Sequence, residues 1–200
     1  MKKIALIVLL LTACAVSGRA QESRQDISLS GTALIEPFMA SSTDVYVDST
    51  TAYGALLSYR FMLTPSSAIE ANYGITYENK IHFSVNPNNY NVLTRTQEVS
   101  AAYVRYFNYR KFNPFVEGGP GVLIFLPILN SGTQTVDAHQ QMQMALMYGA
   151  GIAYEISPSF DIRAEYRGLV TKVPTFNDSQ FTTNRWYNIF EPAVGVAYHF

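Results

Sequence analysis

Few side chains in this sequence are arranged for catalysis or metal binding. The three histidines, His82, His139 and His199, are far apart in the chain and lack the spacing of metal ligands. His82 stands two residues before Ser84, a pair that could supply a base and a nucleophile, but no partner acid can be identified. The preferred interpretation is solvated or packed histidines, so the sequence predicts no catalytic residue, no metal site and no cofactor.

Two other stretches resemble catalytic or phosphate-binding motifs, but a structural role within a strand explains them better. The run Asp161–Arg167 carries four charges at alternate positions, which could imitate a site with paired carboxylates. In a strand, however, these four side chains share one face, where opposite charges neutralise one another. The glycine-rich stretch 118–121 lacks the Lys-Ser/Thr of a phosphate loop and lies within a predicted strand, where it indicates a bend or bulge.

The C-terminal stretch indicates which kind of secondary structure positions these charged side chains. Large apolar side chains alternate there with small or polar ones: Phe190, Pro192, Val194, Val196, Tyr198 and Phe200 against Glu191, Ala193, Gly195, Ala197 and His199. Alternation with a period of two predicts a strand with one apolar face. In water, such a strand at a free terminus would be an adhesive edge. It fits a barrel in which the apolar face meets lipid and the edge pairs with the first strand.

Seven earlier stretches repeat this alternation, so we expect eight strands. They cover residues 27–38, 51–62, 68–78, 95–107, 114–126, 141–156, 160–172 and the C-terminal stretch from Trp186 to Phe200. For 95–107 we do not assign which face is apolar. Arg105 is two residues from Tyr103, so a charged and an aromatic side chain would share one face. Short connections at 64–67, 108–113 and 157–159 alternate with long ones at 39–50, 79–94, 127–140 and 173–185. This asymmetry is typical of an all-β, eight-stranded antiparallel up-and-down transmembrane barrel with short periplasmic turns and four long outer loops.

The face opposite the apolar one carries charges of both signs. We expect a lumen charge network formed by Glu36, Arg60, Glu70, Glu117, Glu155, Asp161, Arg163, Glu165, Arg167 and Glu191. An eight-stranded barrel is only wide enough for side chains to fill it, and a buried charge without a partner costs several kcal/mol. The sequence therefore predicts a lumen that is filled by salt bridges or very narrow.

The start of the chain has the pattern of a targeting segment. Lys2 and Lys3 precede the apolar run 4–11, and Gly18-Arg19-Ala20 offers a cleavage site, so we expect a signal peptide over 1–20 and a barrel domain over 21–200. Lipidation at Cys14, the only cysteine, is the competing interpretation. Cleavage would leave 11 basic and 15 acidic residues, a balance that does not call for nucleic acid as a partner.

This pattern resembles the small OmpA-like outer-membrane barrel family over nearly the whole mature chain, including the terminal run from Val194 to Phe200. The resemblance implies a location in the outer membrane of a Gram-negative bacterium and contact with outer-membrane lipid. It also implies that the barrel-assembly machinery recognises a C-terminal signal, placed here on Val194, Val196, Tyr198 and Phe200. The sequence contains no catalytic motif and no peptidoglycan-binding domain, so neither catalysis nor cell-wall tethering is expected.

The expected role is structural or interactive, with four loops displayed outward. The polar loop stretches 86–91 and 130–133 could bind an extracellular ligand. Three alternatives remain open: a small pore for ions or solutes, an enzyme that modifies outer-membrane lipid, and a soluble periplasmic lipid-binding barrel. The enzyme alternative rests on His82-Phe83-Ser84, which faintly resembles the His-x-Ser of lipid A deacylase barrels but falls in a predicted loop rather than on a late strand.

Overall fold

The protein is described from a computed structural model that covers residues 24–37, 39–40, 45–85, 88–107, 111–128, 140–174 and 185–200. The signal peptide expected over 1–20 lies outside the described residues. The strands are β1 (Gln25–Leu34), β2 (Met39–Ala40), β3 (Val45–Ser49), β4 (Ala52–Thr64), β5 (Ser67–Val85), β6 (Asn88–Tyr106), β7 (Phe112–Pro127), β8 (Gln141–Ser157), β9 (Phe160–Lys172) and β10 (Trp186–His199). Within these ranges, no helix has the length and apolar character needed to cross a membrane.

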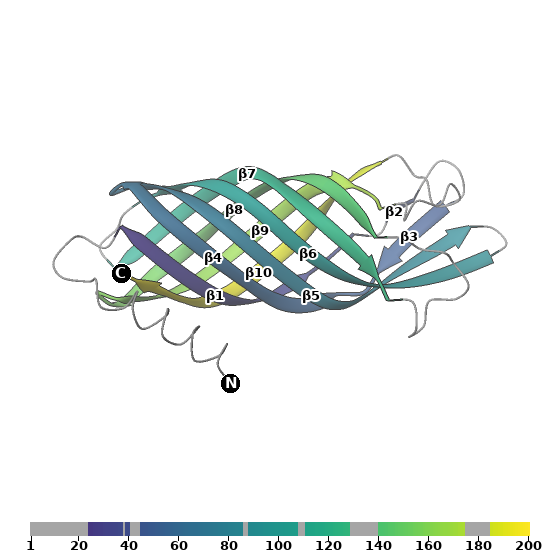
Figure 1. Ribbon diagram of the computed structural model, residues 1–200, viewed down its shortest axis with the longest axis horizontal. Coiled ribbons are helices and arrows are strands. Elements are labelled where there is room, and N and C mark those ends of the chain that lie inside the picture. The colour runs from purple at the N-terminus through teal and green to yellow at the C-terminus, as the bar shows by residue number, and fades with distance from the viewer. Residues whose placement is uncertain are drawn as a thin grey trace, which may run out of the picture.

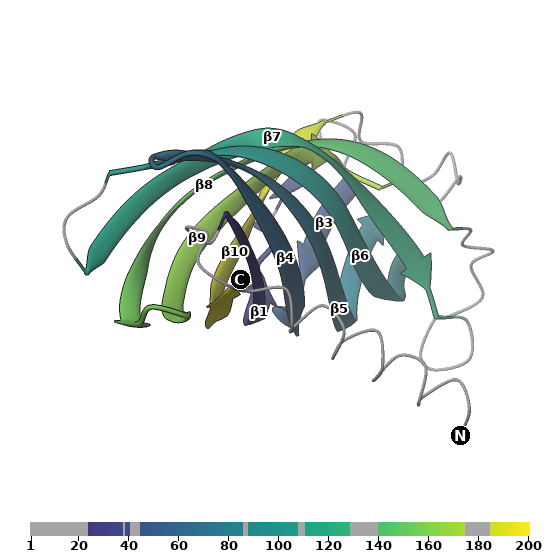
Figure 2. The same ribbon diagram turned by 60° about the vertical axis from the view of Figure 1, so that its left-hand side comes forward.

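Eight of these strands form a closed antiparallel barrel. The order around the ring is β5, β4, β1, β10, β9, β8, β7 and β6, and β6 pairs back onto β5. The first and last strands close it, with Ile27 opposite Tyr198 and Gly31 opposite Val194. Figures 1 and 2 show these strands curving around a common axis. The predicted eight-stranded antiparallel up-and-down barrel is confirmed.

The stagger between the strands fixes the width of the barrel. Directly paired residues can be followed once around the ring through Gln25, Phe61, Ile69, Tyr103, Gly118, Tyr148, Gly168, Phe190 and Ile35. The path starts at Gln25, the first residue of β1, and returns at Ile35, which directly follows β1 and lies ten residues further along the chain. Eight tilted strands with a stagger of this kind enclose a space that side chains can fill.

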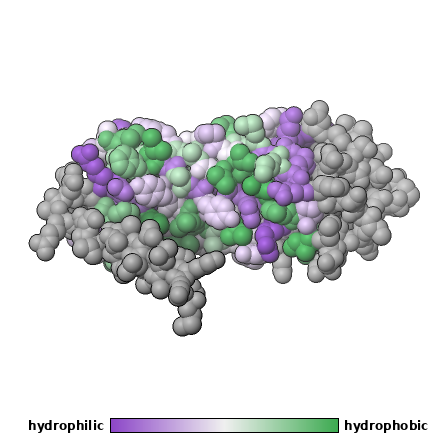
Figure 3. Space-filling view, in the orientation of Figure 1, coloured by the Kyte–Doolittle hydropathy of each residue, from purple (hydrophilic) through white to green (hydrophobic). Residues whose placement is uncertain are grey.

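The two faces of the wall differ as the alternation predicts. Tyr73, Tyr154 and Tyr198 on the outer face are 43%, 41% and 39% exposed, whereas Arg163 on the inner face is 2% exposed. Green hydrophobic residues spread along the described wall in Figure 3, and the largest purple group lies near its right-hand end. A wall of this kind suits hydrocarbon outside and polar groups inside.

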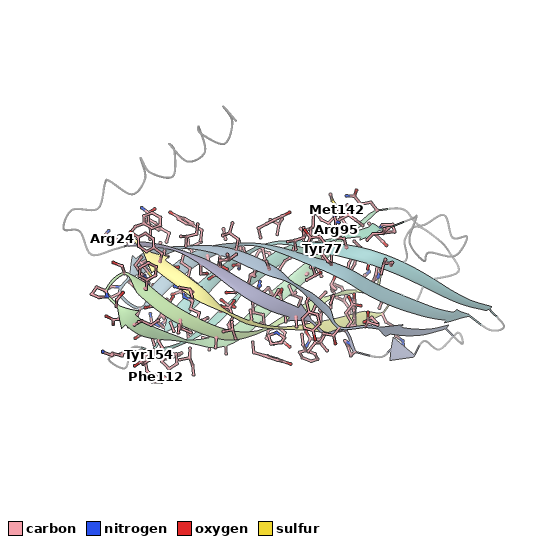
Figure 4. The ribbon with its side chains drawn as sticks, turned by 90° about the horizontal axis from the view of Figure 1, so that it is seen from below. Arg24, Tyr77, Arg95, Phe112, Met142 and Tyr154 are labelled. Atoms are coloured by element: carbon pink, nitrogen blue, oxygen red, sulfur yellow. The ribbon has the colours of Figure 1, made fainter. Side chains whose placement is uncertain are left out.

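Aromatic residues gather at both ends of the outer face. Phe112 and Tyr154 lie side by side at the end with the short turns, with ring centroids 5.2 Å apart (Figure 4). Tyr77 and Arg95 lie at the opposite end, with the guanidinium carbon of Arg95 4.7 Å from the centre of the Tyr77 ring (Figure 4). Amphipathic rings at two levels match the two headgroup regions of a bilayer.

The structure corrects the prediction of a long loop over 79–94. β5 continues to Val85 and β6 begins at Asn88, so the segment is a strand hairpin that extends beyond the other strands at one end of the barrel (Figure 1). β3 pairs along β5, with Val45 opposite Val85, so strands also occupy much of the expected loop 39–50. The alternation of apolar and polar residues continues through 80–85, and the asparagine-rich stretch after it concealed the second strand.

Candidate functional site

Arg60 is the centre of the first group of charges inside the barrel. It projects from β4, fully buried, and pairs with Glu70 of the neighbouring strand β5. Its Nη2 lies 3.4 Å from Glu117 and 3.5 Å from Glu165, two carboxylates on other strands of the ring. Its Nη1 donates to the Tyr106 hydroxyl at 2.7 Å. One guanidinium therefore serves three carboxylates and one hydroxyl.

Arg167 on β9 forms the second group, nearer the long-loop end of the barrel. Its Nη1 donates to Glu191 at 2.9 Å, and its Nη2 pairs with Glu98. Its Nε lies 3.8 Å from Glu117, which therefore lies between the two arginines. Gly149 leaves room for this carboxylate, because a Cβ there would lie 2.7 Å from Glu117 Oε1. The two groups thus form one continuous cluster.

A third group lies at the short-turn end of the barrel. Arg163 Nη2 lies 2.8 Å from Asp26 Oδ2, and both side chains are buried. His199 Nε2 lies 2.8 Å from Asp161 Oδ2, with the histidine side chain 22% exposed. Arg163 and His199 each face one carboxylate, in contrast to the arginines deeper in the barrel.

The structure places each of the ten predicted lumen residues as follows. Eight take part in the ion pairs above: Arg60, Glu70, Glu117, Asp161, Arg163, Glu165, Arg167 and Glu191. Glu36 is buried just beyond the long-loop end of β1. Glu155 is half-buried opposite Asp161 in the β8–β9 ladder, outside these ion pairs.

Sequence reasoning missed four members of the network, Asp26, Glu98, Tyr106 and His199. Asp26 is in phase with the inward residues Ser28 and Ser30, so extending the first strand by one step would have found it. Glu98 and Tyr106 are buried on β6, whose faces Arg105 obscured. Arg105 is exposed on the outer face of β6 one residue from the end of that strand, a position where a long cation can reach the aqueous boundary.

Apolar residues fill the lumen on both sides of the charges. Toward the short turns, an inner apolar layer consists of Ala68, Val104, Tyr106, Phe115 and Ala153, packed against Met62. Toward the long loops, an outer apolar layer consists of Leu34, Leu123, Phe125, Met147, Leu169 and Ile189, all at most 2% exposed. Met147, Leu169 and Ile189 are direct cross-strand neighbours on β8, β9 and β10. The charged groups around Arg60 and Arg167 therefore lie in a compartment with apolar packing on both sides along the barrel axis.

The C-terminal residues Val194, Val196, Tyr198 and Phe200 lie on the outer face. All four are at least 39% exposed, and the Tyr198 ring lies 5.1 Å from that of Phe160 and 6.1 Å from that of Phe200. His82 and Ser84 belong to β5 near its long-loop end. Among the described residues, no group of three or more His, Cys, Asp or Glu could hold a metal ion.

A closed ring of eight strands with an apolar, aromatic-rimmed exterior and a charged interior defines a small transmembrane β-barrel. The chain belongs to the family described as outer membrane protein beta-barrel domain, whose family model matches residues 6–200. It is therefore an outer-membrane β-barrel protein of the OmpA-like type.

Solved structures share this fold at low sequence identity. OprG from Pseudomonas aeruginosa is similar with a TM-score of 0.64 and 11% identity, covering 90% of this chain and 98% of that one. Neisserial surface protein A is similar with a TM-score of 0.62 and 14% identity over 89% and 98%. Ail of Yersinia pestis is similar with a TM-score of 0.54 and 16% identity over 90% and 100%. No curated protein sequence matches the chain.

Proposed function

We propose that this barrel is a closed scaffold in the outer membrane that displays its long-loop end for surface interactions. The observation that carries the proposal is the filling of the lumen. A buried ion-pair cluster occupies its middle, and the outer apolar layer, including Leu123 and Ile189, covers the cluster toward the long loops. An ion crossing this path would have to lose its water and displace packed apolar groups, which is costly.

The long-loop end offers the surface for an interaction. The hairpin of β5 and β6, with β3 beside it, extends there beyond the rest of the barrel (Figure 1). Two cations lie on aromatic rings at this end, Arg95 on Tyr77 and Lys172 on Trp186. A structure of Ail of Yersinia pestis contains the heparin analogue sucrose octasulfate, and that chain is 17% identical to this one with a TM-score of 0.50. A polyanionic extracellular ligand is therefore the first partner to test.

The outer wall and the C-terminal strand support two further partners. The exposed apolar wall suits outer-membrane lipid. The row of Val194, Val196, Tyr198 and Phe200 supports recognition by the barrel-assembly machinery, and no catalytic role is proposed for any residue. Replacing Phe200 and Tyr198 by alanine should reduce the amount of folded barrel in outer-membrane fractions, whereas the same change at Phe112, another exposed aromatic residue at the short-turn end of the outer face, should reduce it less.

Conductance tests the proposed function against its main alternative, a small pore. The folded full-length protein, inserted in planar bilayers at neutral pH, should show no steady openings. A stable single-channel current would contradict the closed scaffold and favour the pore. Binding of the same protein to immobilised heparin, compared with an Arg95→Ala and Lys172→Ala variant, tests the surface interaction separately.

A further inference from the structure

The middle of the lumen contains more carboxylates than cations. We call Arg60, Arg167, Glu70, Glu98, Glu117, Glu165 and Glu191 the central cluster. The seven side chains touch in one network and are between 0% and 6% exposed. Two guanidinium groups face five carboxyl groups, so full ionisation would leave three negative charges without a partner.

The surrounding residues do not supply the missing positive charge. In the described part of the lumen, the other inward-facing guanidinium is that of Arg163, which pairs with Asp26, and the inward-facing imidazole of His199 contacts Asp161. The remaining inward carboxylates, Glu36 just beyond the end of β1 and Glu155 on β8, supply no positive charge to the cluster. Among the described inward residues, β6 contributes the Glu98 carboxylate and the Tyr106 hydroxyl, and β10 contributes the buried Tyr187 hydroxyl.

The cluster is also enclosed and incompletely hydrogen-bonded. The inner and outer apolar layers lie on either side of it. Within the described structure, Glu98 Oε2, Glu117 Oε1 and both amide atoms of Asn72 are buried without a hydrogen-bond partner. Three uncompensated carboxylates in such a place would each cost several kcal/mol. A proton removes this cost without the hydration shell or ligand geometry that a metal ion requires.

We propose that the central cluster binds about three protons at neutral pH and thereby locks the lumen in its packed form. The geometry indicates where the protons lie. Glu117 and Glu165 make the longer contacts with Arg60, at 3.4 and 3.5 Å. Glu98 and Glu191 flank one guanidinium, that of Arg167, so they share the third proton. At alkaline pH the protons leave, the carboxylates repel one another, and the packing of the lumen loosens. This proposal rests on the closed lumen proposed above.

Infrared spectroscopy of the folded protein tests the proposal directly. The carbonyl stretch of protonated carboxyl groups should be present at neutral pH and should disappear reversibly at alkaline pH. Glu117→Gln, Glu165→Gln and Glu191→Gln should each remove part of this band, and the triple variant should remove most of it. Glu155→Gln, outside the cluster, is the matched control and should leave the band unchanged. Heat-modifiable gel mobility verifies that each variant is folded.

Two outcomes would overturn the proposal. The first is a folded wild-type barrel at neutral pH that lacks the band. The second is a thermal unfolding midpoint that follows the concentration of potassium or sodium chloride at fixed pH, because bound cations would then balance the charge. Conductance at neutral pH separates this proposal from the proposed function, because steady current there would contradict the closed scaffold whether or not the band is present.

Discussion

The central cluster and the outer apolar layer, here called the two halves of the upper lumen, are filled by opposite chemistries on the same strands. On β9 the inward residues are charged up to Arg167 and apolar at Leu169, and on β7 Glu117 is followed by Leu123 and Phe125. The central cluster is held by directional contacts that each depend on a specific partner. The outer apolar layer is held by close packing, which depends on volume. The two halves should therefore respond differently to substitution and to pH.

The largest effect is expected from removing a cation of the central cluster. Arg60→Met leaves Glu70, Glu117 and Glu165 without their shared guanidinium, and breaking a buried ion pair costs about 3–5 kcal/mol. Unfolding of the refolded protein in lipid vesicles by urea measures this loss. Arg105→Met on the exposed face of β6 is the matched control and should change the unfolding free energy little. Equal stability of the two variants would mean that the cluster does not hold the barrel.

Truncation in the outer apolar layer should cost nearly as much but by a different mechanism. Leu169→Ala leaves a cavity beside Met147 and Ile189, with an expected loss of about 2–5 kcal/mol. Because no charge is involved, the loss should be the same at neutral and alkaline pH, unlike that of a cluster variant. Leu169→Met, which preserves volume, should recover most of the stability. A loss that changes with pH would show that the two halves are coupled.

The outer wall provides a third region against which to compare the lumen. Leu29 is 63% exposed near the middle of β1, where its surroundings in the membrane are hydrocarbon. Leu29→Arg should destabilise the barrel by about 2–4 kcal/mol, the cost of an arginine near the bilayer midplane. The same substitution at Leu63, near the short-turn end of β4, should cost less because the cation can reach the headgroup level. Equal costs would indicate that the wall is not immersed as proposed.

These regions differ in how far the sequence alone predicts them. The lipid-facing residues of the outer wall can be predicted from the alternation of apolar and polar residues, because a period of two identifies the lipid-facing side of nearly every strand. Two ion pairs are also local, since Arg60 lies directly opposite Glu70 and Arg167 directly opposite Glu191 in neighbouring strands. The contacts of Glu117 with both arginines cross the lumen. They depend on the stagger of the whole ring, which a strand-by-strand pattern does not contain.

The limits of strands were the least predictable feature. Asparagine and proline near residues 86–91 indicated a loop, yet pairing with β3 and β6 continues the strand to Val85. The hydrogen-bonded pairing of β5 with its neighbouring strands outweighed the local preference of these residues for a turn. Glu98 was missed for a related reason, because one outward arginine at the end of β6 disguised the phase of the strand.

The smallest effect is expected at the short-turn end, where His199 faces Asp161. The pair is 2.8 Å apart but partly open to solvent, and ion pairs in such positions contribute about 0–1 kcal/mol. His199→Gln should therefore leave the unfolding free energy nearly unchanged and should leave the alkaline loosening of the lumen intact. Asp161→Asn provides the reciprocal control at the same contact. If His199→Gln abolished the pH dependence, the titrating groups would lie at this rim, and the contrast between the charged and apolar halves would not explain it.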